Sequence, residues 1–331
     1  MLYNNTTTTA SSTDTISQQM TTYTVFGSII IVSNLIILYI AFRSKRFRLF
    51  AYLAVGDLGF GLALLTAGTF RLSYLANGSY FDLIPARTCL LRPWWHFFLV
   101  AYLWPTIATM CITSERIVAL SAPAWYRTQW CAKFELQLIA VGVALYAVCA
   151  APAVYILLST PKSVTVARQC SVSKSLAQSY YSVFYTAVGA VGGLITVVAN
   201  IFVGLLAKKR FSSINAPDNA AFLRRQMRIN RSLGAVVVMS LVFVVIPNCY
   251  RWAGDMKILE VNLIFRRYSL LSFAVNSFVN LYLYLALNSE FRRLALQYFC
   301  GRKGQVIDTT SMVPITTNKP AVKVNPNANT T

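Results

Sequence analysis

Long apolar segments, separated by short polar or basic connectors, run through most of the chain. A helix needs about 20 mostly apolar residues to cross the hydrocarbon core of a membrane. Seven segments reach that length, at residues 22–42, 50–70, 94–120, 134–158, 180–207, 232–252 and 268–288. The pattern therefore predicts an all-α protein, a seven-transmembrane helix bundle.

Polar segments flank the apolar ones and set the expected organisation of the chain. Residues 1–22 are rich in Thr, Ser and Asn and are expected to form an extracellular N-terminal tail, and residues 23–300 hold the helix bundle. An amphipathic pattern at 289–299, within NSEFRRLALQYFC, predicts a short eighth helix. The polar tail at 301–331 has the composition of a disordered cytoplasmic segment.

The composition indicates a protein surrounded largely by lipid. Of the 331 residues, 56% are hydrophobic and only 12% are charged. Soluble domains carry about 25% charged residues, so about half of the usual solvating charge is missing. The net charge is +20, but the basic residues lie between the apolar segments and do not form one basic domain. We therefore expect membrane lipid as a partner and no nucleic acid.

The basic connectors predict which side of the membrane each end of the chain faces. Of the 30 lysines and arginines, 20 fall in the connectors and tail that are cytoplasmic if the N-terminus is extracellular. Acceptor sequons for N-glycosylation at Asn4, Asn5 and Asn77 fall on the opposite side, although two further sequons fall on the basic side. Cys89 and Cys170 also lie on the opposite side, where a disulfide can persist. We expect a multi-pass protein of the plasma membrane with an extracellular N-terminus.

Five polar side chains interrupt the apolar segments at depth. Asp57 lies well inside the second segment, Asn34 at a similar depth in the first, and Asn276, Ser277 and Asn280 in the seventh. Ionisable groups inside a membrane are costly and indicate function. A carboxylate with amide and hydroxyl partners can hold a cation such as sodium or share a proton, so we expect a switching network around Asp57 and no other cofactor. The alternative is a hydrogen-bonded network that only joins helices.

An acid and a base stand side by side where the third segment ends, in CITSERIVALSAPAWYR. Glu115 and Arg116 can neutralise each other there. Adjacent helix positions do not face the same way, however, so Arg116 can instead turn inward and close a cavity between the helices. A third interpretation is an ordinary interfacial arginine that obeys the positive-inside rule. Pro123 and Tyr126 are expected to fix the loop beyond this pair.

Enzyme chemistry finds little support in the sequence. The chain has no GxSxG, HExxH or phosphate-binding loop motif and no paired carboxylates on one helix face at membrane depth, so we expect no enzymatic activity. The one histidine, His96, lacks a cluster of cysteine or aspartate, so no metal site is expected. Cys300 follows the amphipathic segment and is either palmitoylated or unmodified.

Several of these motifs together resemble a known family of membrane receptors. ERIVALSAPAWYR, at 115–127, resembles the acid–arginine signature of rhodopsin-like G-protein-coupled receptors, with its loop proline and the Tyr-Arg pair. LAVGDL resembles their second-helix motif, and NLYLY, from Asn280 to Tyr284, resembles their seventh-helix motif. Pro247 matches their sixth-helix proline. Within the family, the stretch from Cys89 to WYRT is similar to nematode serpentine chemoreceptors of the sx class.

The resemblance implies a receptor that binds an extracellular small-molecule or peptide ligand and signals through a heterotrimeric G protein. The residues implied in coupling and switching are Glu115, Arg116, Tyr126, Arg228, Arg231, Asn280 and Tyr284.

Such a bundle binds its ligand in a crevice between the helices, on the extracellular side. The expected lining is Trp95, Phe98, Tyr102, Asn248, Trp252 and Arg266. Phe98 stands where amine receptors of this fold carry an aspartate, which disfavours a biogenic amine. Ten basic residues face four acidic ones on that side of the membrane, which favours an anionic or polar ligand.

Some positions do not match the family pattern. Leu281 replaces the seventh-helix proline, and Val245 replaces a sixth-helix tryptophan. Met227 replaces an acid that pairs with the signature arginine in some relatives, and Pro105 replaces a common hydroxyl residue. The resemblance therefore does not extend to the aromatic rotamer switch or to an ion pair between the third and sixth helices.

Two other functions are compatible with the same sequence. A membrane transporter or channel would use Asp57 as a cation or proton relay. A membrane-embedded interaction subunit would have no ligand of its own. Receptor, transporter and subunit share the predicted seven-helix architecture, so the distinction depends on the polar sites.

Overall fold

The computed structural model describes residues 5–44, 47–129, 132–176, 180, 187–212, 232–260 and 263–301. Within them, seven helices are long and apolar enough to cross a membrane. This confirms the predicted all-α seven-helix bundle of a multi-pass membrane protein. The spans are formed by α1 (Asn5–Arg43), α2 (Arg48–Ala76), α3 (Pro93–Ser121), α5 (Ala132–Ser159), α8 (Ala187–Ser212), the segment Ser232–Gly254 with α10 (Ile246–Asp255) in its last part, and α11 (Leu263–Leu287).

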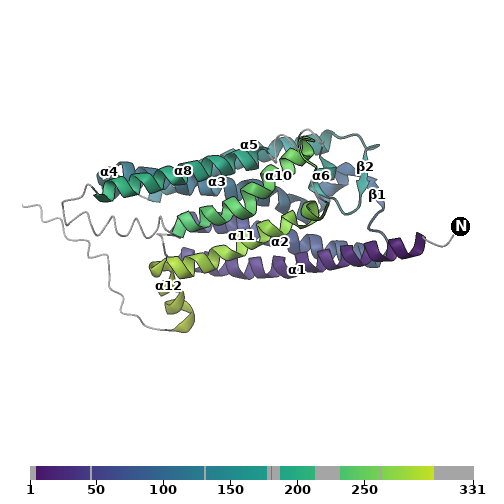
Figure 1. Ribbon diagram of the computed structural model, residues 1–331, viewed down its shortest axis with the longest axis horizontal. Helices are drawn as coiled ribbons and strands as arrows, with labels where there is room; N and C mark the ends of the chain where they lie inside the picture. The colour runs from purple at the N-terminus through teal and green to yellow at the C-terminus, as the bar shows by residue number, and fades with distance from the viewer. Residues whose placement is uncertain are drawn as a thin grey trace, which may run out of the picture.

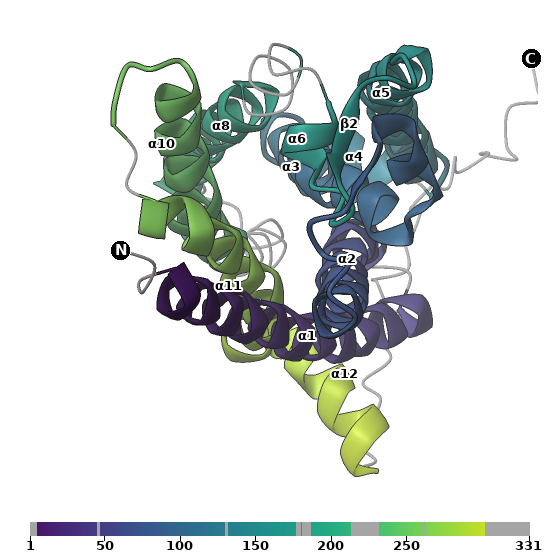
Figure 2. The same ribbon diagram turned by 90° about the vertical axis from the view of Figure 1, so that its right-hand side faces the viewer.

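The helices run side by side along the long axis of the molecule, and the shorter elements lie at its two ends (Figure 1). The strands β1 (Leu83–Pro85) and β2 (Thr165–Ala167) and the helix α6 (Val172–Ser175) mark what we call the disulfide end. Helices α4 (Pro123–Gln129) and α12 (Ser289–Cys300) mark the α4 end. Viewed along the axis, the helices form a ring in which α1 lies beside α2 and α11 (Figure 2).

Small residues allow α1 and α2 to pack backbone against backbone. A Cβ atom added to Gly27 would lie 2.6 Å from the backbone nitrogen of Leu65, and one added to Gly68 would lie 2.8 Å from the carbonyl oxygen of Met20. Lipid gives little hydrophobic drive for helix association, so close packing supplies much of the stabilisation. The α1–α2 contact therefore depends on glycine at these two positions.

Helix α1 begins at Asn5, so most of the expected N-terminal tail at 1–22 is helical instead. No glycine or proline interrupts this segment, and the hydroxyl of Thr21 donates to a carbonyl oxygen one turn earlier at 3.0 Å. The side chains of Met20 and Tyr23 are buried. Packing of these two residues against the bundle extends the helix beyond the apolar span, which polar composition alone did not predict.

A two-stranded antiparallel ribbon, which the sequence did not predict, covers the disulfide end. Strand β1 pairs with β2, and Ile84 lies opposite Val166. Each strand has three residues, too few for an alternating pattern to be recognised. The expected disulfide joins Cys89, in the 3-10 helix Ala86–Leu91, to Cys170, with the Cα atoms 5.4 Å apart.

Helix α12 confirms the predicted amphipathic eighth helix and ends one residue later than expected, at Cys300. Asn288 caps its start, because the side chain accepts a hydrogen bond from the backbone nitrogen of Phe291 at 3.0 Å. Gly301 ends it with a φ of +61°. Phe291 is buried against Tyr284 of α11, with ring centroids 5.6 Å apart. This contact anchors α12 on the bundle.

Large apolar side chains are exposed along the outer faces of several spans. Val32 of α1, Val141 and Val148 of α5, and Ile201 and Leu205 of α8 are among them. Soluble monomers rarely expose so many large apolar side chains along several neighbouring helices. These faces suit contact with lipid.

We expect Gly27→Ala to lower the free energy of unfolding by about 1–3 kcal/mol, because the added Cβ atom meets the α2 backbone. Gly204→Ala in α8 is the matched control: its Cβ meets nothing within 4 Å, and alanine favours a helix by about 1 kcal/mol over glycine. Thermal unfolding in detergent measures both variants. A Gly27→Ala protein as stable as the control would contradict the close α1–α2 packing.

Candidate functional site

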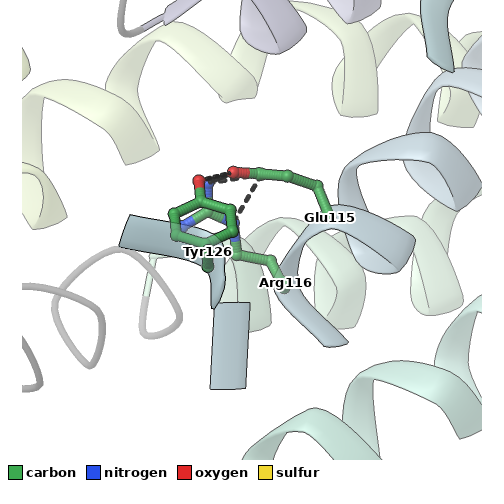
Figure 3. Close-up of polar contacts among 3 residues, drawn as sticks. All are labelled: Glu115, Arg116 and Tyr126. Carbon is green, nitrogen blue, oxygen red and sulfur yellow. Dashed lines mark hydrogen bonds and ion pairs between the residues drawn. The ribbon is translucent and has the colours of Figure 1, made fainter. Parts of the chain in front are cut away.

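An acid, a base and a phenol meet at the α4 end of the bundle. Glu115 and Arg116 lie near the end of α3, and Tyr126 lies on α4. The chain turns between these helices at Ala122, and Pro123 begins α4, where a proline without an N–H costs no helix hydrogen bond. The turn brings Tyr126 back over the last turns of α3 (Figure 3).

Arg116 folds back onto its neighbour and does not point away from it. Its Nε donates to Glu115 Oε2 at 2.8 Å and its Nη2 donates to Oε1 at 2.6 Å (Figure 3). The Tyr126 hydroxyl donates to the same carboxylate at Oε1. Glu115 is 3% exposed and Arg116 is 8% exposed. The flexible arginine side chain thus overcomes the divergence of adjacent helix positions, and the result is a buried ion pair closed by a residue from another helix.

Burial and the negative charge of Glu115 raise the pKa of the Tyr126 phenol above its ordinary value. The phenol is therefore protonated at neutral pH and acts as a donor. A buried ion pair contributes little net stability, but removal of one partner typically costs about 3–5 kcal/mol because the other charge is left uncompensated. The structure holds the cluster in its paired arrangement, and a cost of this size is what separating the pair would have to overcome.

A second polar site surrounds Asp57 in the middle of the bundle. Ser277 Oγ donates to Asp57 Oδ1 and Asn280 Nδ2 donates to Oδ2, both at 2.8 Å. Asn34 Nδ2 donates to the Ser277 carbonyl oxygen at 3.3 Å and to the Ile30 carbonyl oxygen at 3.0 Å. The structure thus brings Asn34, Asp57, Ser277 and Asn280 together, from α1, α2 and α11.

Asp57 is 1% exposed, and within the described ranges no lysine, arginine or histidine pairs with it. A cavity of about 40 Å³ reaches Asp57, Asn276 and Ser277. That volume is enough for a water molecule or a small ion. An isolated buried carboxylate is costly, so this one is suited to carry a proton or a small cation.

Asn276 and Tyr284 have other main partners than Asp57. Asn276 lines the small cavity beside Asp57, but its side chain accepts a hydrogen bond from Ser240 of the sixth span at 3.2 Å and so joins α11 to that span. Tyr284 is buried edge-on against Phe50, with ring centroids 4.8 Å apart. Among the described residues, none accepts a hydrogen bond from its hydroxyl.

The sixth span contains a break in its hydrogen-bond ladder. Pro247 has no N–H, so it cannot bond the Phe243 carbonyl one turn earlier. That carbonyl accepts instead from Ser272 Oγ of α11 at 2.8 Å, and Leu241–Val245 form a π-helical turn. Such turns are frequent at functional sites. The break gives the sixth span a point about which its two halves can reorient.

A crevice of about 230 Å³ opens at the disulfide end. Phe98 and Tyr102 of the predicted pocket line it, but Trp95 does not: it is 0% exposed and donates from Nε1 to Ser175 Oγ at 3.0 Å. Asn248 lines the deeper cavity beside Asp57, and Trp252 lines neither space. The expectation that Trp95 lines the crevice is wrong, because its ring is fully buried and bonded to Ser175.

Sequence reasoning placed Arg251 at the ligand crevice but missed Arg71. Both arginines line the crevice, together with Tyr23, Tyr80 and Gln169. Arg71 directly follows the second apolar segment as it was drawn from the sequence, so it was counted only as a connector charge. The signal that could have identified it is a basic residue directly after an apolar run, in a sequence that can continue the helix past it.

The structure describes only some of the remaining predicted site residues. Asn77 is exposed in the turn that ends α2, accessible to modification. Asn5 begins α1 and Cys300 ends α12, but their side chains, like that of Arg266, lie outside the described set. Asn4, Arg228 and Arg231 lie outside the described residues altogether. Within the described part of the chain, no group of three or more His, Cys, Asp or Glu residues could hold a metal ion.

No protein-family model matches the chain, and no curated protein matches it. What the molecule does must therefore be inferred from its own residues and their geometry.

We expect Tyr126→Phe to loosen α4, because the Glu115 carboxylate loses a charge-assisted hydrogen bond that contributes about 1.5–3 kcal/mol. Hydrogen exchange of the α4 amides, residues 124–129, should become faster. Tyr155→Phe, an exposed phenol of α5, is the control and should leave exchange unchanged.

The same variant has a pH signature with a defined sign. The raised pKa means that the Tyr126 contribution is present at neutral pH, starts to fall above the ordinary phenol pKa of about 10, and is lost through the higher folded-state value. The stability difference between wild type and Tyr126→Phe should therefore be larger at pH 7 than at pH 11. An equal difference at both values would contradict the donor role of Tyr126.

Proposed function

We propose that the chain is a ligand-activated receptor of the rhodopsin-like G-protein-coupled class, similar to nematode serpentine chemoreceptors. Its ligand enters the crevice at the disulfide end, and a heterotrimeric G protein binds at the α4 end. The observation that carries this proposal is the buried Glu115–Arg116 pair, closed by Tyr126 from α4. It supports a latch that a partner protein opens, at the end of the bundle opposite a ligand-sized crevice.

The proposed orientation places the disulfide end outside the cell and the α4 end in the cytoplasm of a plasma-membrane protein. The excess of basic residues in the connectors of the α4 end supports it, as does a disulfide at the other end. The turn that carries Asn77 also lies at the disulfide end, where a glycan would be added.

Helix α3 offers a direct path between the two ends. Phe98 and Tyr102 line the crevice, and Arg116 lies on the same helix 14 residues beyond Tyr102, about 21 Å along the axis. A ligand that contacts α3 favours the conformer it binds best. The break at Pro247 supports reorientation of the sixth span in that conformer. Release of Arg116 from Glu115 then exposes a guanidinium to the G protein.

The crevice volume favours a small molecule over a peptide. Pockets for drug-sized ligands hold about 300–1,000 Å³, whereas this crevice holds about 230 Å³. Phe98, in the place of an amine-binding aspartate, also disfavours a cationic amine.

A test compares wild type with Arg116→Gln and with the double variant Glu115→Gln/Arg116→Gln in cells that carry G-protein dissociation sensors. Each is exposed to a diverse set of small odorants, and surface expression is measured in parallel. We expect both variants to lose the ligand response or to signal without ligand. The double variant leaves no uncompensated buried charge, so it should fold even if the single variant does not.

Arg43→Ala is the matched control, because it removes one exposed positive charge from the same end of the bundle. It should retain the wild-type dose response. If Arg116→Gln and the double variant reach the surface and also respond like wild type, the proposed latch is wrong.

A transporter or channel is the second candidate, and one observation favours it: Asp57 is buried beside a small cavity, and no basic side chain of the described residues pairs with it. Purified protein in liposomes distinguishes the two functions. Proton or sodium flux that is lost in Asp57→Asn would support the relay, and its absence together with an Arg116-dependent G-protein response would support the receptor.

A further inference from the structure

Arg71 places a guanidinium inside the wall of the crevice at the disulfide end. The residue lies in the last two turns of α2, lines the crevice and is only 7% exposed. Its Nε donates to the carbonyl oxygen of Gln169 at 3.0 Å. Gln169 directly precedes Cys170 of the disulfide, so the bond ties α2 to the connector that covers the crevice. This bond holds the arginine side chain in place.

The described residues provide no counter-charge for Arg71. No carboxylate among them pairs with it, and the crevice lining contains no acidic residue. The titratable side chains that interact with it are the phenols of Tyr23, Tyr80 and Tyr102, and none of them is a carboxylate. Burial raises the pKa of the Tyr80 phenol further above its ordinary value. A buried charge is normally paired, and here the pairing partner is not supplied by these neighbours.

The guanidinium retains hydrogen-bonding capacity toward the crevice. Arginine has five N–H donors, and only the one on Nε is used by Gln169. Among the described residues, none accepts from the two terminal nitrogens. Two terminal N–H groups can bind both oxygens of one carboxylate in a planar, bidentate arrangement. Arg251, which also lines the crevice, adds a second positive charge to the same space.

The rest of the lining sets the size and polarity of an occupant. Phe98, Met20 and Leu270 supply apolar surface, and Gln19 and Ser173 supply polar groups at the edge. The space of about 230 Å³ is below that of drug-sized ligand pockets, about 300–1,000 Å³. This combination suits a short apolar body that ends in a single anionic group.

We propose that the crevice binds a small organic acid, with its carboxylate held by Arg71 and its apolar body against Phe98. The inference rests on the proposed receptor function and names its ligand class. Since Arg71 is already fixed by Gln169, little side-chain freedom is lost on binding. The burial of the guanidinium keeps water from competing for the carboxylate, which strengthens the pair.

The test measures direct binding to purified protein in lipid nanodiscs by titration calorimetry, without a G protein. The probes are acetate, hexanoate, benzoate and phenylacetate, each beside its neutral amide, together with inorganic sulfate. We expect at least one organic carboxylate to bind, and to bind at least ~10-fold more tightly than its amide, because a hydrogen bond to a charged partner is worth about that factor or more.

Three substitutions locate the binding group. Arg71→Gln should weaken carboxylate binding by at least ~10-fold and leave amide binding unchanged, whereas Arg71→Lys should retain part of the affinity because it keeps the charge but not the bidentate geometry. Arg87→Gln is the control: it removes an exposed charge from the same end and does not line the crevice. If Arg71→Gln does not fold, the carboxylate–amide comparison and Arg71→Lys still decide.

Several results would overturn the inference. They are failure of every carboxylate to bind, equal binding of acid and amide, tighter binding of sulfate than of any organic acid, or unchanged affinity in Arg71→Lys and Arg71→Gln. The proposed function fails separately: carboxylate binding without Arg116-dependent G-protein activation would remove the receptor, and activation by neutral ligands alone would remove only the organic-acid site.

Discussion

A charge buried inside a membrane bundle must be balanced by the protein or its ligands, because lipid offers no counter-charge. The three buried sites meet this constraint to different degrees. Glu115 has a full ionic partner in Arg116, whereas Asp57 has only neutral donors and Arg71 has only a carbonyl acceptor among the described residues. The first site is complete by itself and can be closed. The other two are balanced only when a proton, a cation or an anion joins them, so they are the sites at which the proposed receptor would bind its ligand or an ion.

Three helices connect these sites, because each carries residues of more than one. Helix α3 extends from the crevice to Arg116, and α2 carries both Arg71 and Asp57. Helix α11 binds Asp57 through Ser277 and lines the crevice of Arg71 with Leu270. A displacement of any one helix therefore changes the geometry of two sites. A packed bundle transmits such displacements because its helices are in close contact, as Gly27 of α1 is with the α2 backbone, and one helix cannot move without moving its neighbour.

The sequence predicted well what depends on a single segment and poorly what depends on contacts between segments. The seven spans, the eighth helix and the depth of Asp57 follow from apolar length and amphipathic period, and the structure agrees. The start of α1 at Asn5 depends on Met20 packing against the bundle, and the β1–β2 ribbon depends on pairing between distant connectors. The crevice shows the same difference between single segments and contacts. The sequence correctly placed Phe98 and Tyr102 on α3. The direction of the Trp95 ring and the place of Arg71 in the crevice wall depend on bonds to Ser175 and Gln169 in a distant connector, so the sequence did not predict them.

The size of the electrostatic terms limits how strongly Arg71 and Asp57, which share helix α2, can be coupled. Arg71 and Asp57 are 14 residues apart, about 21 Å along the helix and nearly four full turns, so they face the same side. At an effective dielectric constant of about 20, opposite unit charges at that distance attract by only about 0.8 kcal/mol. An anion bound to Arg71 would cancel this attraction, yet coupling between sites typically requires about 1–3 kcal/mol. Charge alone is therefore too weak to carry a signal along α2. The larger part of any coupling between the two sites must therefore come from movement of the helix. Arg71 is bonded to the connector that covers the crevice, and Asp57 is bonded to α11. A ligand that displaces Arg71 would also displace Asp57, because both residues lie on one rigid helix.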